Sequence, residues 1–230
     1  MSTVLITGAN RGLGLEFVRQ YAQKGWHILA ACRSPESANE LGAIAKDVSN
    51  IELLTLDVTK ESDIDALAKN LAGKAIDHLI LNAGVLGADC ATLGEMTQAK
   101  WLEVLTINTV APALLIQALR DNVASSELKT IVGISTRVAS IGDNGSGNMY
   151  SYRTSKAALN QILVSAAQNL REQGVKTLAI HPGWVQTDMG GQDATFTAKE
   201  SVSGIINVAE NLTLEESGSF RVFDGSTVEW

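Results

Sequence analysis

A tyrosine and a lysine stand four residues apart in the segment "MYSYRTSK", which spans residues 149–156. Four residues make slightly more than one helical turn, so on a helix the side chains of Tyr152 and Lys156 would share one face. A neighbouring ammonium stabilises a phenolate and lowers the tyrosine pKa, which is ordinarily about 10. The spacing therefore predicts a proton-transfer pair, provided that other elements build a site around it. The alternative is a tyrosine and a lysine on an exposed helix face.

A second pattern lies near the N-terminus, where the apolar run "TVLIT" is followed by "GANRGLG" and then by helical periodicity. Gly8, Gly12 and Gly14 would let the backbone of this turn approach a pyrophosphate closely. The amides and the dipole at the start of the next helix favour an anion there. A glycine-rich turn can also serve packing alone. Its position directly after the first strand favours dinucleotide binding, and no Gly-Lys-Ser/Thr follows that would indicate a P-loop.

The end of the second predicted strand indicates which dinucleotide would bind. A nicotinamide cofactor without the extra phosphate usually meets an acidic residue at this point. Here the sequence reads "ILAACRSPES", with Cys32 at the position of the acid and Arg33 directly after it. A guanidinium suits a 2′-phosphate, and Arg11 in the glycine loop adds a second positive charge. The pattern predicts NADP(H) rather than NAD(H).

These residues need elements that bring them together, and the chain alternates short apolar runs with longer amphipathic segments. The runs read as strands buried on both faces, which is typical of a parallel sheet with helices on each side. We expect a single α/β domain over 1–230, a Rossmann-type doubly wound sheet of about seven strands. The predicted strands are 3–7, 27–31, 51–56, 77–81, 130–135, 176–181 and 219–223.

Composition limits the partners that the chain is expected to have. The 230 residues carry a formal net charge of −7, which argues against nucleic acid, because phosphate binding needs a basic surface. No signal peptide is recognised, and no apolar run approaches the roughly 18 residues needed to span a bilayer, "VAPALLIQAL" being too short. The two cysteines, Cys32 and Cys90, form no C-x-x-C pair. We therefore expect a cytoplasmic protein with no membrane or nucleic-acid partner.

The glycine spacing, Gly-x-x-x-Gly-x-Gly, differs from that of the usual dinucleotide fingerprint. With the preceding threonine, "TGANRGLG" resembles the cofactor loop of the short-chain dehydrogenase/reductase family. Further segments match that family in order along almost the whole chain: "LDV" (56–58), "NAG" (82–84), "YRTSK" (152–156) and "PGWVQT" (182–187).

The resemblance implies roles for four catalytic residues. Tyr152 would be the general acid or base, and Lys156 would lower its pKa and bind the nicotinamide ribose. The family has a serine at the end of the fifth strand, usually the second of a Ser-Ser pair, whereas this chain reads "GISTRVASIG". Thr136 keeps the hydroxyl and is our choice, with Ser135 as the fallback. Asn108 matches a helix asparagine whose main chain holds a water of the proton relay.

The same resemblance, together with the glycine loop, predicts the residues that bind the cofactor. Asp57 and Val58 would frame the adenine, "NAG" would pass beneath a ribose, and Thr187 would bind the nicotinamide end. The full predicted set is Gly8, Asn10, Arg11, Gly12, Leu13, Gly14, Arg33, Asp57, Val58, Asn82, Ala83, Gly84, Tyr152, Lys156, Pro182, Gly183, Val185 and Thr187. No metal cluster is predicted.

Within the family, "GSGNMYSYRTSKAALN" and "GSFRVFDGSTVEW" resemble the C-factor or sniffer-like branch of carbonyl reductases. The expected activity is NADPH-dependent reduction of an aldehyde, ketone or quinone, in a fairly open site with Trp184 and Met189 as walls. Two alternatives stay open: an NADP(H)-binding regulatory or signalling protein with little turnover, and an NAD-dependent alcohol dehydrogenase. By resemblance, the helices that start near Thr97 and Tyr152 would form the face of a homodimer or homotetramer.

Overall fold

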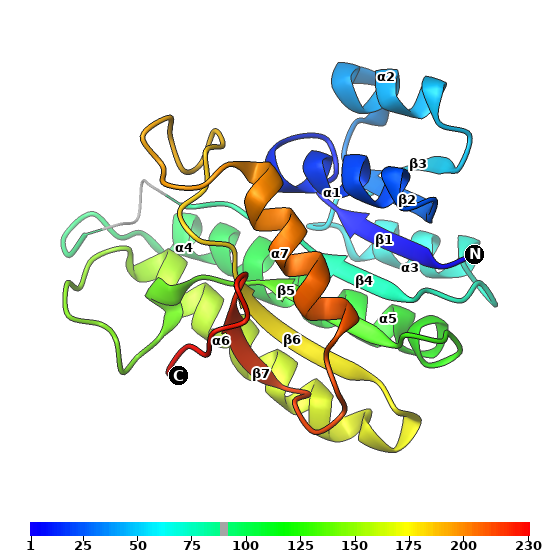
Figure 1. Cartoon of the computed structure of the whole chain (residues 1–230). Coiled ribbons are helices and arrows are strands. Elements are labelled where there is room, and N and C mark those ends of the chain that lie inside the picture. Colours follow the sequence, from blue (N-terminus) through cyan, green and yellow to red (C-terminus); the bar gives the residue numbers. More distant parts are fainter. Residues whose placement is uncertain (88–91) are drawn as a thin grey trace.

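A seven-stranded parallel sheet forms the centre of the computed structural model, which describes residues 1–87 and 92–230 (Figure 1). The strand order is β3-β2-β1-β4-β5-β6-β7, and every neighbouring pair is parallel. This is the doubly wound arrangement that the sequence predicted, and each strand lies within about one residue of its predicted range. The strands are β1 (Thr3–Thr7), β2 (His27–Cys32), β3 (Ile51–Thr55), β4 (His78–Leu81), β5 (Thr130–Ile134), β6 (Lys176–His181) and β7 (Ser219–Val222).

Helices cover both faces of the sheet because the strands are apolar on both sides. On one face, α1 (Gly12–Gln23), α2 (Asn39–Asp47) and α7 (Ala198–Glu210) pack on a core that includes Ile6 and Ile180. On the other, α3 (Glu61–Asn70), α5 (Ala111–Ala124) and α6 (Tyr150–Asn169) pack on a core that includes Leu79 and Ile131. Short helical turns are η1 (Pro35–Ser37), η4 (Arg137–Ala139) and η5 (Arg171–Gln173).

The helix before β5 is longer than the sequence suggested. The α4 (Gln98–Leu105), η3 (Thr106–Val110) and α5 segments follow one another without a break, and η3 is a π-helical turn. Together they form a 27-residue helix, Gln98–Ala124, whose most apolar 18-residue window has a mean hydropathy of 1.6. By length and composition alone this helix could cross a membrane, so the expectation that no segment approaches that length is wrong. Reading "VAPALLIQAL" by itself missed the apolar residues of α4. In the fold, α5 packs on the sheet and 39% of that window is buried.

The topology determines where a ligand would bind. Strand order reverses between β1 and β4, so the chain leaves these two neighbouring strands toward opposite faces of the sheet. In such sheets, ligands bind in the crevice outside the carboxyl ends of the strands at this point. The glycine loop follows β1, "NAG" follows β4, and Ser135 and Thr136 follow β5. The motifs predicted from sequence therefore meet at one edge of the sheet.

Candidate active site

The turn between β1 and α1 has the geometry of an anion-binding loop. Gly8 and Gly12 adopt positive φ values of 67° and 53°, which β-carbon-bearing residues rarely adopt. A Cβ on Gly14 would lie 2.1 Å from the carbonyl oxygen of Gly8, so only glycine allows the helix to begin this close to the turn. No side chain caps the start of α1, which leaves its first amides open to a ligand. Asn10 and Arg11 are exposed at the rim of the turn.

The segment "NAG" lies beside this turn and holds it in place. The amide nitrogen of Asn82 donates from its side chain to the carbonyl oxygens of Thr7 (2.9 Å) and Gly8 (3.2 Å). In return, the hydroxyl of Thr7 accepts hydrogen bonds from the backbone amides of Asn82 (3.0 Å) and Ala83 (3.1 Å). Sequence reasoning assigned no role to Thr7, although the threonine in "TGANRGLG" was a usable signal. Thr7 joins the ends of β1 and β4 at the site.

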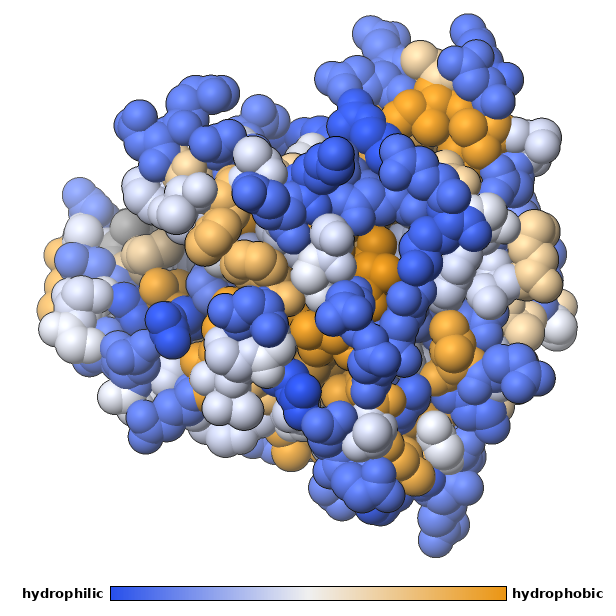
Figure 2. Space-filling model, in the orientation of Figure 1, coloured by the Kyte–Doolittle hydropathy of each residue, from blue (hydrophilic) through white to orange (hydrophobic). Residues whose placement is uncertain are grey.

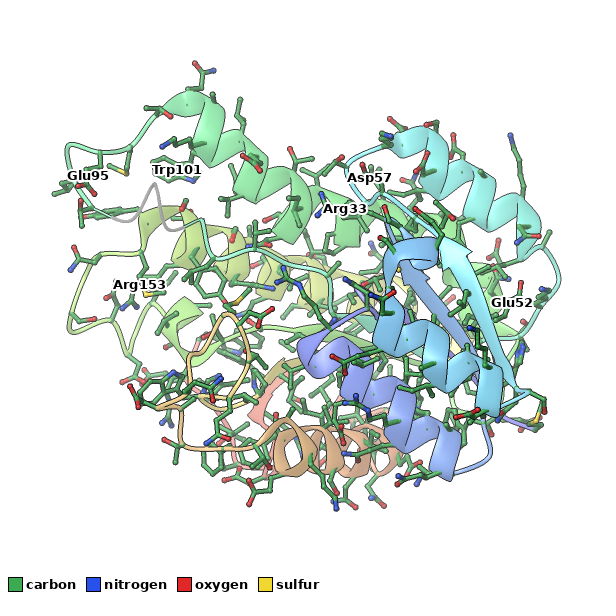
Figure 3. All side chains as sticks on the ribbon, turned by 90° about the horizontal axis from the view of Figure 1, so that it is seen from above. Arg33, Glu52, Asp57, Glu95, Trp101 and Arg153 are labelled. Atoms are coloured by element: carbon green, nitrogen blue, oxygen red, sulfur yellow. The ribbon has the colours of Figure 1, made fainter. Side chains whose placement is uncertain are left out.

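The end of β2 forms the predicted adenosine side of the site. The backbone amide of Ala9 donates to the carbonyl of Ala31 (3.1 Å), which places the glycine loop against this strand end. Cys32 is buried and Arg33 is exposed, in a position near Asp57 (Figure 3). The Asp57 carboxylate accepts hydrogen bonds from the hydroxyl (2.7 Å) and amide (3.0 Å) of Thr59. The hydroxyl bond is the main cause of a lowered pKa at Asp57, and the positive charge of Arg33 contributes.

The catalytic pair predicted from "YRTSK" lies on the first turns of α6. Lys156 is 4% exposed, and its ammonium donates to the carbonyl of Ile134 (2.7 Å), the last residue of β5. A methyl group placed on Gly84 would lie 3.4 Å from the Lys156 nitrogen, so the ammonium lies in the crevice between β4 and β5. Tyr152 lies one helical turn before Lys156, so the two side chains are on the same face of α6.

The pKa values of the pair correct one expectation. Burial raises the pKa of Tyr152 to about 12 and lowers the pKa of Lys156 to about 8. The sequence analysis expected Lys156 to lower the pKa of Tyr152, but burial raises it instead. The spacing alone could not show this, because desolvation depends on packing that the motif does not encode.

The hydroxyls at the end of β5 have different surroundings. Ser135 is 2% exposed, and its hydroxyl donates to the side-chain oxygen of Asn160 on α6 (2.5 Å). Thr136 is 9% exposed, and its hydroxyl has no hydrogen-bond partner within the described residues. The threonine hydroxyl is therefore available to a ligand, whereas the serine hydroxyl joins β5 to α6.

Asn108 lies in the π-helical turn η3 and is fully buried. Its side chain accepts a hydrogen bond from the amide of Val85 (2.9 Å) and donates to the carbonyl of the same residue (2.8 Å). It also donates to the hydroxyl of Ser155 (3.0 Å), the neighbour of Lys156. A π turn changes the backbone hydrogen-bond register and is frequent at functional sites. Asn108 therefore connects the segment after β4 with α6.

The segment after β6 extends to the glycine loop. The methyl group of Thr187 would lie 3.5 Å from a Cβ placed on Gly12. The Thr187 hydroxyl accepts a hydrogen bond from the amide of Gly190 (3.2 Å).

The other predicted residues of this segment have the following surroundings. Gly183 has a φ of 83° and is packed against Phe196 and Phe223, and the carbonyl of Pro182 accepts a hydrogen bond from Ser201 (2.7 Å). Val185 is buried; Trp184 and Met189 are 54% and 48% exposed.

One contact across the site was not foreseen. The guanidinium of Arg11 donates to the carboxylate of Asp188 (2.9 Å), which joins the glycine loop to the segment after β6. Arg11 and Asp188 are 177 positions apart, and both side chains are exposed. No sequence pattern relates residues so distant. Ser155 and Asn160, by contrast, could have been found from the sequence, because their spacing places them on the same helix face as Tyr152 and Lys156.

The arrangement fits a dinucleotide. Arg11 and Arg33 follow β1 and β2, Cys32 rather than an acid ends β2, and a glycine loop with open amides lies at the centre. The side of the site near β4 and β5 holds a buried ammonium, a tyrosine and an unbonded threonine hydroxyl. Leu13 and Val58 pack against the cores beside the loop.

Over residues 1–87 and 92–230 no group of three or more His, Cys, Asp or Glu could hold a metal ion. Cys90 lies outside the described residues.

A model of the short chain dehydrogenase family matches residues 2–197. The chain therefore belongs to the short-chain dehydrogenase family, as the motifs indicated.

Individual proteins that resemble the chain include carbonyl reductases. The NADPH-bound carbonyl reductase from chicken fatty liver has a TM-score of 0.92 and 36% identity, covering 100% of this chain and 98% of the other. The carbonyl reductase Sniffer of D. melanogaster also has a TM-score of 0.92, with 32% identity and all of both chains covered. The C-signal of Myxococcus xanthus is 41% identical over 165 residues, which is 72% of this chain and 99% of that protein. These similarities confirm the predicted carbonyl reductase-like branch of the family.

Proposed function

We propose that the protein reduces a carbonyl compound to an alcohol with NADPH. The observation that carries this proposal is the position of Lys156, whose ammonium is fixed by Ile134 in the crevice between β4 and β5, one helical turn from Tyr152. The glycine loop and the two arginines fit NADP(H), and several similar structures were crystallised with NADPH or NADP bound. The prediction of the cofactor agrees with those neighbours.

The residues of the site supply the other half of the reaction. A bound NADPH would supply the hydride that adds to the carbonyl carbon, and the carbonyl oxygen must then gain a proton. Tyr152 gives that proton, so its O–H bond breaks as the O–H bond of the alcohol forms. Thr136 donates a hydrogen bond that orients the carbonyl oxygen. Lys156 would bind a ribose hydroxyl of the cofactor and would stabilise the phenolate left behind, and Asn108 positions the segment through which the proton is replaced.

The raised pKa of Tyr152 suits the role of a proton donor. With a pKa of about 12, the phenol keeps its proton at neutral pH, as a proton donor must. Oxidation of an alcohol needs the phenolate as a base, and that form is scarce under the same conditions. The shift therefore supports Tyr152 as the proton donor in carbonyl reduction.

The decisive experiment measures consumption of NADPH by the purified protein with a panel of aldehydes, ketones and quinones. Replacement of Tyr152 by phenylalanine should lower kcat by about 10²–10⁴-fold, because the proton donor is lost. Unfolding free energy should change by less than about 0.5 kcal/mol, since the hydroxyl has no hydrogen-bond partner within the described residues. NADPH affinity, measured by calorimetry, should stay within about threefold of that of the parent protein. Equal turnover by the variant would exclude this role for Tyr152.

A regulatory role is a second candidate because the chain is 41% identical to a protein called C-signal. It predicts NADPH binding with no turnover on any member of the carbonyl panel. The NAD-dependent alternative is distinguished by affinity, because Arg33→Ala should weaken NADP(H) binding and leave NAD(H) binding unchanged if Arg33 binds the 2′-phosphate.

A further inference from the structure

Arg11 and Asp188 form an ion pair across the mouth of the site. The glycine loop carries Arg11 at the N-cap of α1, and Asp188 follows Thr187 in the segment between β6 and α7. Their side chains are 68% and 77% exposed and the charged atoms lie 2.9 Å apart. Figure 1 shows this gold segment beside the dark-blue turn after β1. Exposed ion pairs contribute little stability in water, so either partner can exchange for another ion at small cost.

The same arginine belongs to the loop whose backbone is bonded to the adenosine side of the site. Ala9, two residues before Arg11, donates from its backbone amide to the carbonyl of Ala31 at the end of β2. Arg33 follows that strand end, and the dinucleotide argument above places the 2′-phosphate between these two arginines. A phosphate carries more negative charge than a carboxylate and accepts bidentate hydrogen bonds from a guanidinium. Arg11 therefore has a carboxylate on one side and the expected position of a stronger anion on the other.

Asp188 belongs to a segment that is hydrogen-bonded within itself and to Ala194 and Phe196. The amide of Gly191 donates to the carbonyl of Thr187 (2.9 Å), and the indole nitrogen of Trp184 donates to the carbonyl of Gly190 (2.7 Å). Release of Asp188 would therefore loosen the link between this turn and the glycine loop, while the pairing of 184–186 with Phe196 stays in place. The contact of Thr187 with the loop at Gly12 would also stay.

We propose that Asp188 is a specificity-determining residue that holds Arg11 when the site is empty and yields it to the 2′-phosphate. NADP(H) then breaks the ion pair between the glycine loop and this segment, whereas NAD(H), which lacks this phosphate, leaves the pair intact. Asp188 acts as an internal competitor that lowers NADP(H) affinity and speeds its release. This inference rests on the proposed function for the identity of the cofactor.

The test measures dissociation constants of NADPH and NADH by calorimetry for four proteins: the parent, Asp188→Asn, Arg11→Gln and the double variant. Asp188→Asn should tighten NADPH binding about threefold to fivefold and leave NADH unchanged, because the carboxylate competes only with the 2′-phosphate. Arg11→Gln should weaken NADPH binding about tenfold. The double variant should match Arg11→Gln, because Asp188 acts through Arg11.

Asp193→Asn is the matched control. It removes the same charge from the same connection between β6 and α7, and its carboxylate makes no ion pair among the residues that the structure describes. If Asp193→Asn tightens NADPH binding as much as Asp188→Asn does, general charge repulsion explains the effect. The proposed exchange of Arg11 between Asp188 and the 2′-phosphate would then be wrong. Equal tightening of NADPH and NADH, or no tightening, overturns it as well. These binding results would overturn the exchange without contradicting the proposed reductase activity. Failure of the parent protein to bind either cofactor would instead refute the proposed function.

Discussion

Burial controls the proton affinity of both members of the Tyr152–Lys156 pair, and it does so in opposite directions. Desolvation disfavours a charged form, so it raises the pKa of the phenol and lowers that of the ammonium. Both groups are thereby drawn toward neutrality in the protein alone. The chemistry of reduction then depends on the charge of Lys156, because its ammonium must stabilise the phenolate that forms.

The pH dependence of carbonyl reduction follows from this. The ammonium of Lys156 loses its proton as the pH rises through about 8, while Tyr152 stays protonated until about 12. We therefore expect kcat/KM for NADPH-dependent reduction to be constant below about pH 7 and to fall above about pH 8. The measurement is a pH profile at constant ionic strength. A Lys156→Arg variant that retains activity should not show this fall, since arginine stays charged; a profile that is flat to pH 10 in the parent would contradict the assignment.

The two hydroxyls after β5 should separate catalysis from stability. Thr136→Ala should lower kcat about 10²-fold and Thr136→Ser should retain most activity, because only the hydroxyl orients the substrate. Ser135→Ala should instead lower the unfolding free energy by about 1–3 kcal/mol, since it leaves the side-chain oxygen of Asn160 buried without its donor. Kinetics and urea unfolding of the three variants check this. A larger kinetic defect in Ser135→Ala than in Thr136→Ala would reverse the assignment.

At the scale of elements, the glycine loop works only because β1 and α1 approach so closely. Gly14→Ala would place a methyl group 2.1 Å from the carbonyl of Gly8, so the helix must shift. We expect a loss of about 2 kcal/mol or more in unfolding free energy and weaker NADPH binding. Gly42→Ala in α2 is the matched control, because nothing lies within 4 Å of its added Cβ, and helix propensity should stabilise it by about 0.5–1 kcal/mol. Similar thermal shifts in both variants would show that the close approach is unimportant.

The elements were largely predictable from sequence, and the contacts between them were not. Strand runs such as "TVLIT" and "KTLAIH" have an apolar centre with polar residues only near their ends, and this pattern is local, so β1 and β6 were found at their observed bounds. The position of the pair on α6 followed from helical phase. The π turn at Asn108 had no local signal, and neither did the contact of Arg11 with Asp188, because both depend on how distant segments meet. The long helix Gln98–Ala124 was underestimated because its apolar residues are spread over three segments.

At the scale of the whole molecule, its surface offers one candidate for self-association. Figure 2 shows a face that is mainly hydrophilic, with apolar groups in small clusters. Along the continuous helix of α4 and α5, Leu102 and Val110 are 51% and 47% exposed. Family resemblance associates this helix and α6 with the subunit contact, and we propose that the protein is a homodimer or homotetramer through this face.

A charge on this helix should disrupt the assembly. Leu102→Glu should convert the oligomer to a monomer at micromolar concentration, because a carboxylate would have to be buried without a partner. Analytical ultracentrifugation of the parent and the variant measures this. Trp230→Glu is the control, since that side chain is 47% exposed but contacts Phe220 beside β7 instead. A parent protein that sediments as a monomer would disprove the proposed assembly.

The indole of Trp184 gives the molecule a built-in optical reporter. It is half exposed and tied to the turn that also carries Asp188, so its emission should respond when that turn changes its surroundings. Rapid-mixing fluorescence can therefore time the opening and closing of the site in the unlabelled protein, with Trp184→Phe to identify the signal.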